Sequence, residues 1–99
     1  MPRYGRTDLN QKEIVAYLRE HGATVAILSN VGGGIPDLLV GYEGKNFLIE
    51  VKSTVTNYGR NGLNDMQIEW HDKWKGQVSV VNTKEEALDL LLREQNQEI

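Results

Sequence analysis

Cysteine is absent from the 99 residues, and histidine occurs only at His21 and His71. The chain therefore has neither a disulfide framework nor a thiolate metal site, and a structural zinc site is not expected. No segment approaches the ~18 uninterrupted apolar residues of a membrane-spanning helix. The first residues also lack the apolar run of a secretory signal peptide. These absences lead us to expect an intracellular, cytoplasmic protein.

An excess of positive charge is absent as well. Fourteen acidic residues against eleven basic ones give a net charge of −3. A protein that coats nucleic acid regardless of sequence would be strongly basic, so this class is disfavoured. An enzyme that acts on nucleic acid is not excluded, because the carboxylates of a metal site contribute to this sum and bound cations reverse their local effect.

The length of the chain and its hydrophobic share of 39% predict one compact domain with a single core. We expect this domain to span residues 1–99, with its core over about 8–92 and a short tail at each end. There is no internal repeat and no low-complexity segment.

Hydrophobic periodicity predicts elements in the order α-β-β-β-α-β-α, an α/β fold with a mixed sheet. Asp8 and Gln11 have the spacing of a capping box at the start of the first helix. An apolar stripe on that helix consists of Leu9, Ile14, Tyr17 and Leu18. The expected helices cover 8–21, 64–76 and the segment after Thr83, and the expected strands cover about 23–29, 35–42, 46–52 and 78–80.

Charged residues stand in two of these strands, where a half-buried strand is normally apolar. Side chains alternate across a strand, so Glu50 and Lys52 share one face while the apolar residues between them occupy the other. A short hairpin would bring Asp37 beside Glu50. Two adjacent carboxylates repel unless a cation lies between them, and hard oxygen ligands suit Mg²⁺ or Mn²⁺. Together with a lysine, these are the groups needed to hydrolyse a phosphodiester.

The segments that carry these residues resemble those of a known nuclease superfamily. Pro36-Asp37 followed by Glu50-Val51-Lys52 resembles the PD-(D/E)xK signature, whose restriction-endonuclease-like core has the order α-β-β-β-α-β. More narrowly, GIPDL (34–38), IEVKS (49–53) and LNDMQIEW (63–70) are similar to the VRR-NUC family. The similarity covers about residues 8–90.

The resemblance implies a role for each residue of the signature. Asp37, Glu50 and the backbone carbonyl of Val51 would bind Mg²⁺ or Mn²⁺, and Lys52 would be catalytic. Gln67, at the start of the second helix, would face the site.

The family usually adds an acidic residue from the first helix to its metal site. Asp8 is nearest to that position, and Glu13 is a second candidate.

Minimal VRR-NUC proteins are similar to Holliday-junction resolvases. The resemblance therefore implies a homodimeric endonuclease that selects branched DNA, such as four-way junctions. Alternatives are a nicking, end-trimming or restriction-type nuclease of the same superfamily, or a non-catalytic nucleic-acid-binding module. A helicase or another repair partner is left open. The candidate phosphate contacts are Arg60, Lys45, Lys73, Lys75, Arg3 and Arg6.

Simpler structural explanations exist for the same residues. Asp37 would serve as a turn residue after the glycines, and Glu50 with Lys52 would form a solvated strand face. Gln67 would close a capping box with Asn64.

Other residues of interest are expected to have structural roles. The helical spacing of Met66, Trp70 and Trp74 predicts core packing rather than base stacking, and His71 is expected at the surface. The three glycines at 32–34 are expected to let the backbone bend tightly and to let DNA approach closely.

Overall fold

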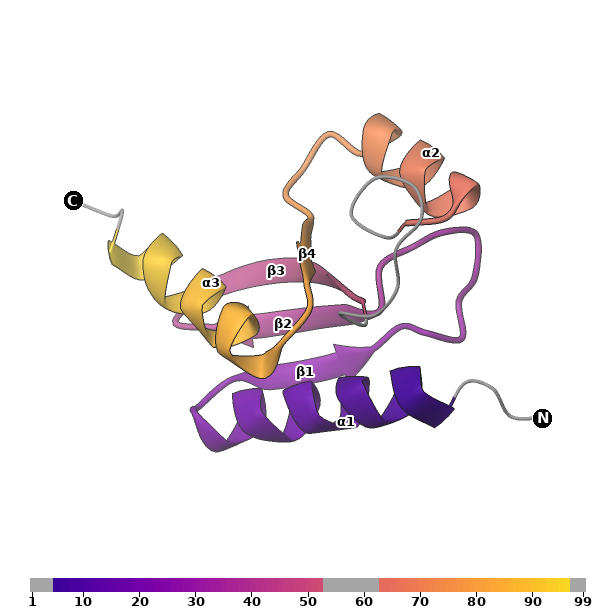
Figure 1. Ribbon diagram of the computed structural model, residues 1–99. Helices are drawn as coiled ribbons and strands as arrows, with labels where there is room; N and C mark the ends of the chain where they lie inside the picture. The colour runs from indigo at the N-terminus through magenta and orange to yellow at the C-terminus, as the bar shows by residue number, and fades with distance from the viewer. Residues whose placement is uncertain (1–4, 53–62, 97–99) are drawn as a thin grey trace.

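The computed structural model describes residues 5–52 and 63–96, and the elements follow one another in the expected order (Figure 1). The expected α/β fold with a mixed sheet is confirmed. The elements are α1 (Gly5–Glu20), β1 (Thr24–Ile27), β2 (Leu38–Tyr42), β3 (Lys45–Val51), α2 (Asp65–Lys73), β4 (Ser79–Val81) and α3 (Lys84–Asn96).

The sheet has the strand order β1-β2-β3-β4. The first three strands are antiparallel, and β4 runs parallel to β3. Glu43 and Gly44 connect β2 to β3 with φ angles of 50° and 81°, as a tight hairpin turn with the twist of the strands requires. The parallel pairing of β4 needs a long crossover, and α2 lies within it.

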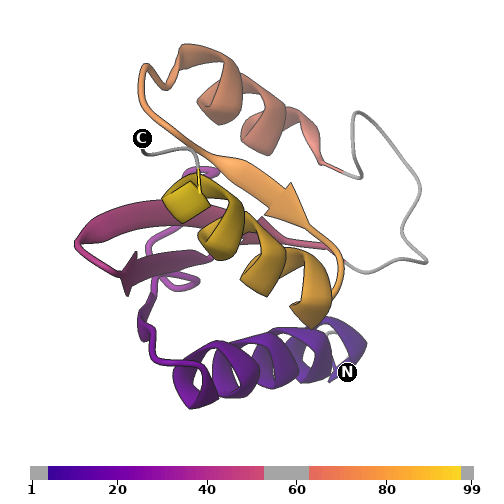
Figure 2. The same ribbon diagram turned by 90° about the vertical axis from the view of Figure 1, so that its left-hand side faces the viewer.

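The hydrophobic core lies on the face of the sheet that α1 and α3 cover. In both ribbon views the strands lie between α1 and α2, so α2 is on the opposite side (Figures 1 and 2). The alternation predicted for β3 is confirmed, because its odd-numbered apolar residues enter the core. The buried members of this core include Ile14, Leu18, Leu38, Val40, Phe47, Ile49, Val51, Ala87 and Leu91.

The second helix differs from its prediction in its packing and its end. Met66 and Trp74 are 58% and 44% exposed, so the prediction that they belong to the core is wrong. None of the nine α2 residues, all within the described part of the chain, is buried. The helix ends at Lys73 rather than Gly76, because Trp74 has an extended backbone and acts as the C-cap.

The start of α1 also differs from its prediction. The helix begins at Gly5, so Asp8 lies inside it and is not the N-cap. Leu9, expected in the apolar stripe, is 67% exposed because it lies ahead of the part of the helix that packs on the sheet, where Ile14 and Leu18 are fully buried.

The predicted cap of α2 is confirmed. The side chain of Asn64 accepts a hydrogen bond from the backbone N–H of Gln67, and the side chain of Gln67 accepts one from the N–H of Asn64. This reciprocal pair fixes the first turn of the helix and the position of Gln67.

No helix in the described part of the chain is both long and apolar enough to cross a membrane.

Candidate active site

Asp37 is fixed between two strands just before β2 begins. Its carbonyl accepts a hydrogen bond of 2.7 Å from the N–H of Leu28, and its Oδ2 accepts one of 2.9 Å from the N–H of Val51. The register pairs Leu38 with Ile49, and one further step along it sets Asp37 opposite Glu50. The hairpin thus brings the two carboxylates together, in the arrangement expected from the sequence.

Glu50 is the buried partner in this pair, with 1% of its surface exposed. Its Oε2 accepts a hydrogen bond of 2.8 Å from Nε2 of Gln67 and lies 3.7 Å from Nζ of Lys52. Its Oε1 is buried and has no hydrogen-bond donor among the described residues. Such an atom is rare in folded proteins and calls for an explanation.

The surroundings of Glu50 change its protonation. Burial, and next the negative charge of Asp37, raises the pKa of Glu50 to about 8, and the nearby ammonium group of Lys52 offsets this only in part. Without a cation, the Glu50 carboxyl group is therefore mostly protonated at pH 7.

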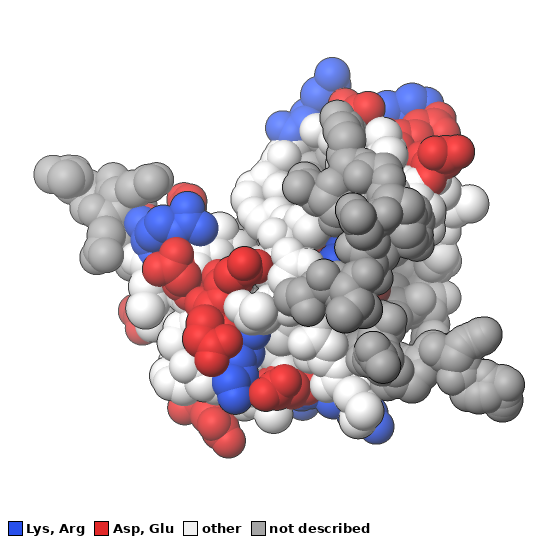
Figure 3. All heavy atoms as spheres, in the orientation of Figure 1, with Lys and Arg blue, Asp and Glu red and all other residues white. Residues whose placement is uncertain are grey.

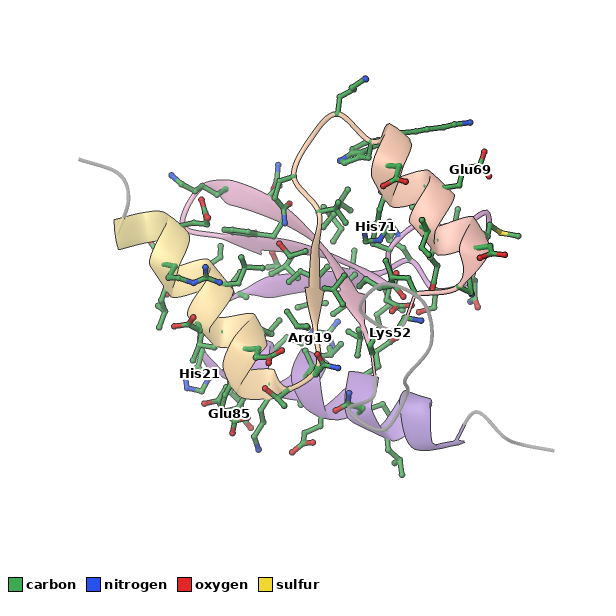
Figure 4. All side chains as sticks on the ribbon, turned by 45° about the horizontal axis from the view of Figure 1, so that its top comes forward. Arg19, His21, Lys52, Glu69, His71 and Glu85 are labelled. Atoms are coloured by element: carbon green, nitrogen blue, oxygen red, sulfur yellow. The ribbon has the colours of Figure 1, made fainter. Side chains whose placement is uncertain are left out.

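Lys52 directly follows β3, and its backbone is held from three sides. Its N–H donates to the carbonyl of Val81 at 2.9 Å. Its own carbonyl accepts hydrogen bonds from Nδ2 of Asn10 at 3.2 Å and Nδ2 of Asn82 at 3.4 Å. The side chain, 14% exposed, lies at the end of β3 (Figure 4). These bonds fix the direction in which the lysine leaves the sheet.

The polar contacts behind this centre were not predicted from the sequence. The hydroxyl of Ser29 lies 3.2 Å from Oε1 of Gln11 and 3.4 Å from Oδ1 of Asp37, which links α1 to the carboxylate. Asn10 bridges the carbonyls of Lys52 and Asn82. Ser29 has one signal in the sequence, a polar side chain at the end of a predicted strand. Asn10 has none, because its partners are 42 and 72 residues away.

Among the described residues, none of the remaining candidates is shown to contact this centre. Glu13 forms an ion pair of 3.0 Å with Lys84 on α3 and does not join the site. Lys73 pairs with Glu69 at 2.9 Å, and Lys75 is exposed after α2. Lys45 is the first residue of β3. Arg3 and Arg60, and the side chains of Arg6 and Asp8, lie outside the described part of the chain.

Two further expectations concern a histidine and the glycine-rich turn. His71 is half-buried rather than exposed, because it lies on the side of α2 that faces the sheet (Figure 4). At Gly34 the close neighbour within the protein is α2, because a Cβ atom there would lie 2.6 Å from the carbonyl oxygen of Met66. Its φ of +85° and this close approach both require glycine. At Gly32 and Gly33, by contrast, no described atom lies within 4 Å of the Cβ position.

The donor set fits a hard divalent cation. Among the described residues there is no group of three or more acidic, histidine or cysteine side chains that could hold a metal. Mg²⁺, however, is commonly held by one or two carboxylates, with water completing its shell. Oε1 of Glu50, buried beside a second carboxylate, is the kind of atom that such an ion would satisfy. Asp37 and Glu50 are therefore suited to Mg²⁺ or Mn²⁺.

Comparisons of the chain with models of known families, with curated proteins and with solved structures gave no match.

Proposed function

We propose that the chain is a Mg²⁺- or Mn²⁺-dependent nuclease that hydrolyses phosphodiester bonds in DNA. The supporting observation is the meeting of Asp37, Glu50 and Lys52 at one end of the β2–β3 hairpin, with one Glu50 oxygen buried and lacking a donor. A solvated strand face does not account for this arrangement, because Glu50 is 1% exposed. Burying a carboxyl group with one oxygen left unsatisfied is costly, which favours a functional role for Asp37 and Glu50.

In this proposal Asp37, Glu50 and the backbone carbonyl of Val51 hold the cation. When bound, the ion would lower the pKa of a water molecule and offset charge on the phosphate. Gln67 holds Oε2 of Glu50 and so leaves Oε1 for the ion. The backbone N–H of Val51 likewise donates a hydrogen bond to Oδ2 of Asp37 and fixes that carboxylate.

Lys52 supplies the cationic group of the reaction. Its ammonium group would orient the attacking water and stabilise negative charge on the phosphate oxygens. The water would attack in line with the leaving oxygen, and no covalent intermediate with the protein would form. The fixed backbone of Lys52 limits the directions from which its amine can act.

The charge of α3 disfavours DNA approach over that helix. Acidic side chains gather over that helix, which carries Glu85, Glu86 and Asp89 (Figure 3). These would repel a phosphate backbone. Helix α2 also carries acidic residues, Asp65, Glu69 and Asp72, of which Glu69 pairs with Lys73 at 2.9 Å. We further propose selection of branched DNA by a homodimer, because two sites related by symmetry suit paired cuts in a four-way junction.

A cleavage assay tests the proposal. A four-way junction, a flap and a linear duplex are each incubated with Mg²⁺ or Mn²⁺ and the wild-type protein. We expect the junction to be cut fastest, and we expect Asp37→Asn and Glu50→Gln to lose about 100-fold or more of this activity while remaining folded. Lys52→Ala is expected to lose cleavage but to keep DNA binding.

Full activity in either carboxylate variant would refute the site. A wild-type protein that binds DNA without cutting it, and that binds no Mn²⁺ in calorimetry, would instead be a nucleic-acid-binding module.

A further inference from the structure

A groove of about 310 Å³ lies between α2 and the glycine-rich turn at residues 32–34. Its volume is at the lower end of the range of small-molecule sites, roughly 300–1,000 Å³. We call it the indole groove. It is lined by Gly33, Met66, Glu69, Trp70, Lys73 and Trp74.

The two indole rings of this groove are held in place before any ligand binds. The rings of Trp70 and Trp74 are stacked, with centroids 4.7 Å apart and an interplanar angle of 18°. Nε1 of Trp74 donates a hydrogen bond of 3.2 Å to the carbonyl of Gln77. A Cβ atom at Gly76 would lie only 3.0 Å from that nitrogen, so a larger residue there would crowd the ring. An exposed aromatic ring that is already fixed binds a flat ligand with little loss of conformational entropy.

Core packing does not explain these residues. Trp74 and Met66 remain 44% and 58% exposed. Exposed apolar side chains that line a hollow indicate a binding surface. The six lining residues are far fewer than the roughly 20–30 residues per side of a standard protein interface. The size of the groove therefore favours a small flat group over a second protein chain.

The groove adjoins the proposed cleavage centre through shared elements. Gln67, which donates to Glu50, precedes Trp70 by three residues and so lies nearly one turn away on the same helix. On the other wall, Gly34 contacts the backbone of Met66 and precedes Asp37 by three residues. A nucleic acid at the carboxylates can therefore reach the indoles with a neighbouring nucleotide.

The charges in the groove favour a base over a phosphate. Its only ionic side chains among the described lining residues are Glu69 and Lys73, and they pair with each other at 2.9 Å. A phosphate site would present unpaired cations or backbone N–H groups, whereas a base needs an apolar, aromatic surface.

We propose that the indole groove binds an unpaired nucleobase next to the phosphate that is cut, which deepens the proposed nuclease function and rests on it. Stacking on an aromatic ring tolerates any base, because every base has a π face. The groove would then favour DNA with an unpaired nucleotide, such as a flap, a gap or an opened junction, over a continuous duplex.

Fluorescence of 2-aminopurine tests the inference without cleavage. A short single strand and a matched duplex, each carrying one 2-aminopurine, are titrated with the full chain in the presence of a metal chelator. We expect binding of the single strand to quench the probe. Trp74→Leu is expected to raise its Kd at least about fivefold, since base–aromatic stacking contributes about 1–3 kcal/mol. Trp74→Phe keeps an aromatic face and is expected to bind more nearly like the wild type.

Leu92→Ala is the matched control, because Leu92 is an apolar residue of α3 with a similar exposure of 43%. It is expected to leave both titrations unchanged. Should Trp74→Leu lose its folded circular-dichroism spectrum, Met66→Ser removes apolar surface from the same groove and leaves both indoles intact. It is then expected to weaken single-strand binding and spare the duplex.

The possible outcomes separate this inference from the nuclease proposal. Equal Kd values for the single strand in folded Trp74→Leu and wild type would overturn the inference, even if the wild type cuts DNA. Trp74-dependent quenching by a protein that cuts nothing would support base binding and refute the nuclease. A lower sedimentation mass in Trp74→Leu, with unchanged strand binding, would overturn the inference and make the groove a surface for self-association.

Discussion

The two faces of the sheet use the same strands for different purposes. On one face, Leu38 and Ile49 are fully buried under α1 and α3. On the other, Glu50 is equally buried but has an ionisable carboxyl group, and the covering helix α2 has no buried residue of its own. The first face stabilises the fold. The second holds a polar centre at a cost in stability, as is common at functional sites.

The contrast is sharpest between neighbours in one strand. Ile49 and Glu50 differ by one position, yet one packs in the core and the other lies beside Asp37, Lys52 and Gln67. The predictions below test whether the two faces have these separate roles.

Truncation of Ile49 gives the largest expected loss of stability. Ile49→Ala removes buried methyl groups and leaves a cavity, so we expect the free energy of unfolding to fall by about 2–5 kcal/mol. Leu39→Ala is the control, because Leu39 lies on the other face of the sheet and is 39% exposed. It is expected to cost less than about 1 kcal/mol. Equal losses in urea denaturation would show that both faces contribute alike to the core.

Gly34 tests how α2 is held over the polar face. Gly34→Ala would place a Cβ atom 2.6 Å from the carbonyl oxygen of Met66, so either the glycine-rich turn or α2 must shift. A shift of α2 would strain the hydrogen bond from Gln67 to Glu50. Gly32→Ala is a close control, since its φ of +84° matches the +85° of Gly34 but no described atom lies within 4 Å of its Cβ position.

We expect Gly32→Ala to lose about 1 kcal/mol through backbone strain alone. Gly34→Ala is expected to lose about 1–3 kcal/mol more, because the contact adds to that strain. Thermal unfolding measures both losses. Matching unfolding temperatures would mean that the contact with α2 is unimportant.

Glu50 tests whether the polar face costs stability. The unfolded chain releases this proton near pH 4.5 and the folded chain near pH 8, so between these values the folded state binds more protons. The free energy of unfolding therefore falls as the pH rises through this window, and it levels off above pH 8. Glu50→Gln keeps the shape and carries no charge, so it escapes this loss.

In the presence of a chelator, we expect the Tm of Glu50→Gln to match the wild type near pH 4.5. At pH 8.5 it is expected to exceed the wild-type Tm by several degrees. If the proposed metal site is correct, added Mn²⁺ reduces or reverses the difference, because an ion bound by the wild-type carboxylates stabilises the folded state. A constant difference between pH 4.5 and 9 would contradict the raised pKa of Glu50.

The same contrast explains what the sequence could predict. In β3, side chains alternate from one face of the sheet to the other. The sequence therefore assigns Glu50 and Ile49 to opposite faces, independently of which elements cover those faces, and the structure agrees. In α2 the four-residue spacing shows only that Met66, Trp70 and Trp74 share a side. Whether another element covers that side depends on tertiary packing, and here none buries it.

Contacts between distant segments mark the other limit of prediction. The capping box of Gln67 follows from a local pattern, and the family resemblance implies that Gln67 faces the site; its hydrogen bond to Glu50 is known only from the structure. The bond from Asn10 to Lys52 joins residues 42 positions apart, so no local pattern indicates it. The ion pair between Glu13 and Lys84, 71 positions away, likewise could not be predicted from a local pattern.

Substitution of Glu13 has the smallest expected effect on stability and metal binding. It helps to decide which of the two acidic candidates on the first helix, Glu13 or Asp8, belongs to the metal site. Its carboxylate is 58% exposed and pairs with Lys84 on the side of the molecule where α1 meets α3. Exposed ion pairs of this kind contribute little to stability. Glu13→Gln is therefore expected to leave both the unfolding midpoint and Mn²⁺ affinity close to wild type, as measured by urea denaturation and calorimetry. Asp8→Asn is the informative companion, because its carboxylate is the other helix candidate for the metal. A large loss of Mn²⁺ binding in Glu13→Gln would mean that α1 rearranges around the ion. The helix that covers the core face of the sheet would then also take part in metal binding, and the two faces would not have separate roles.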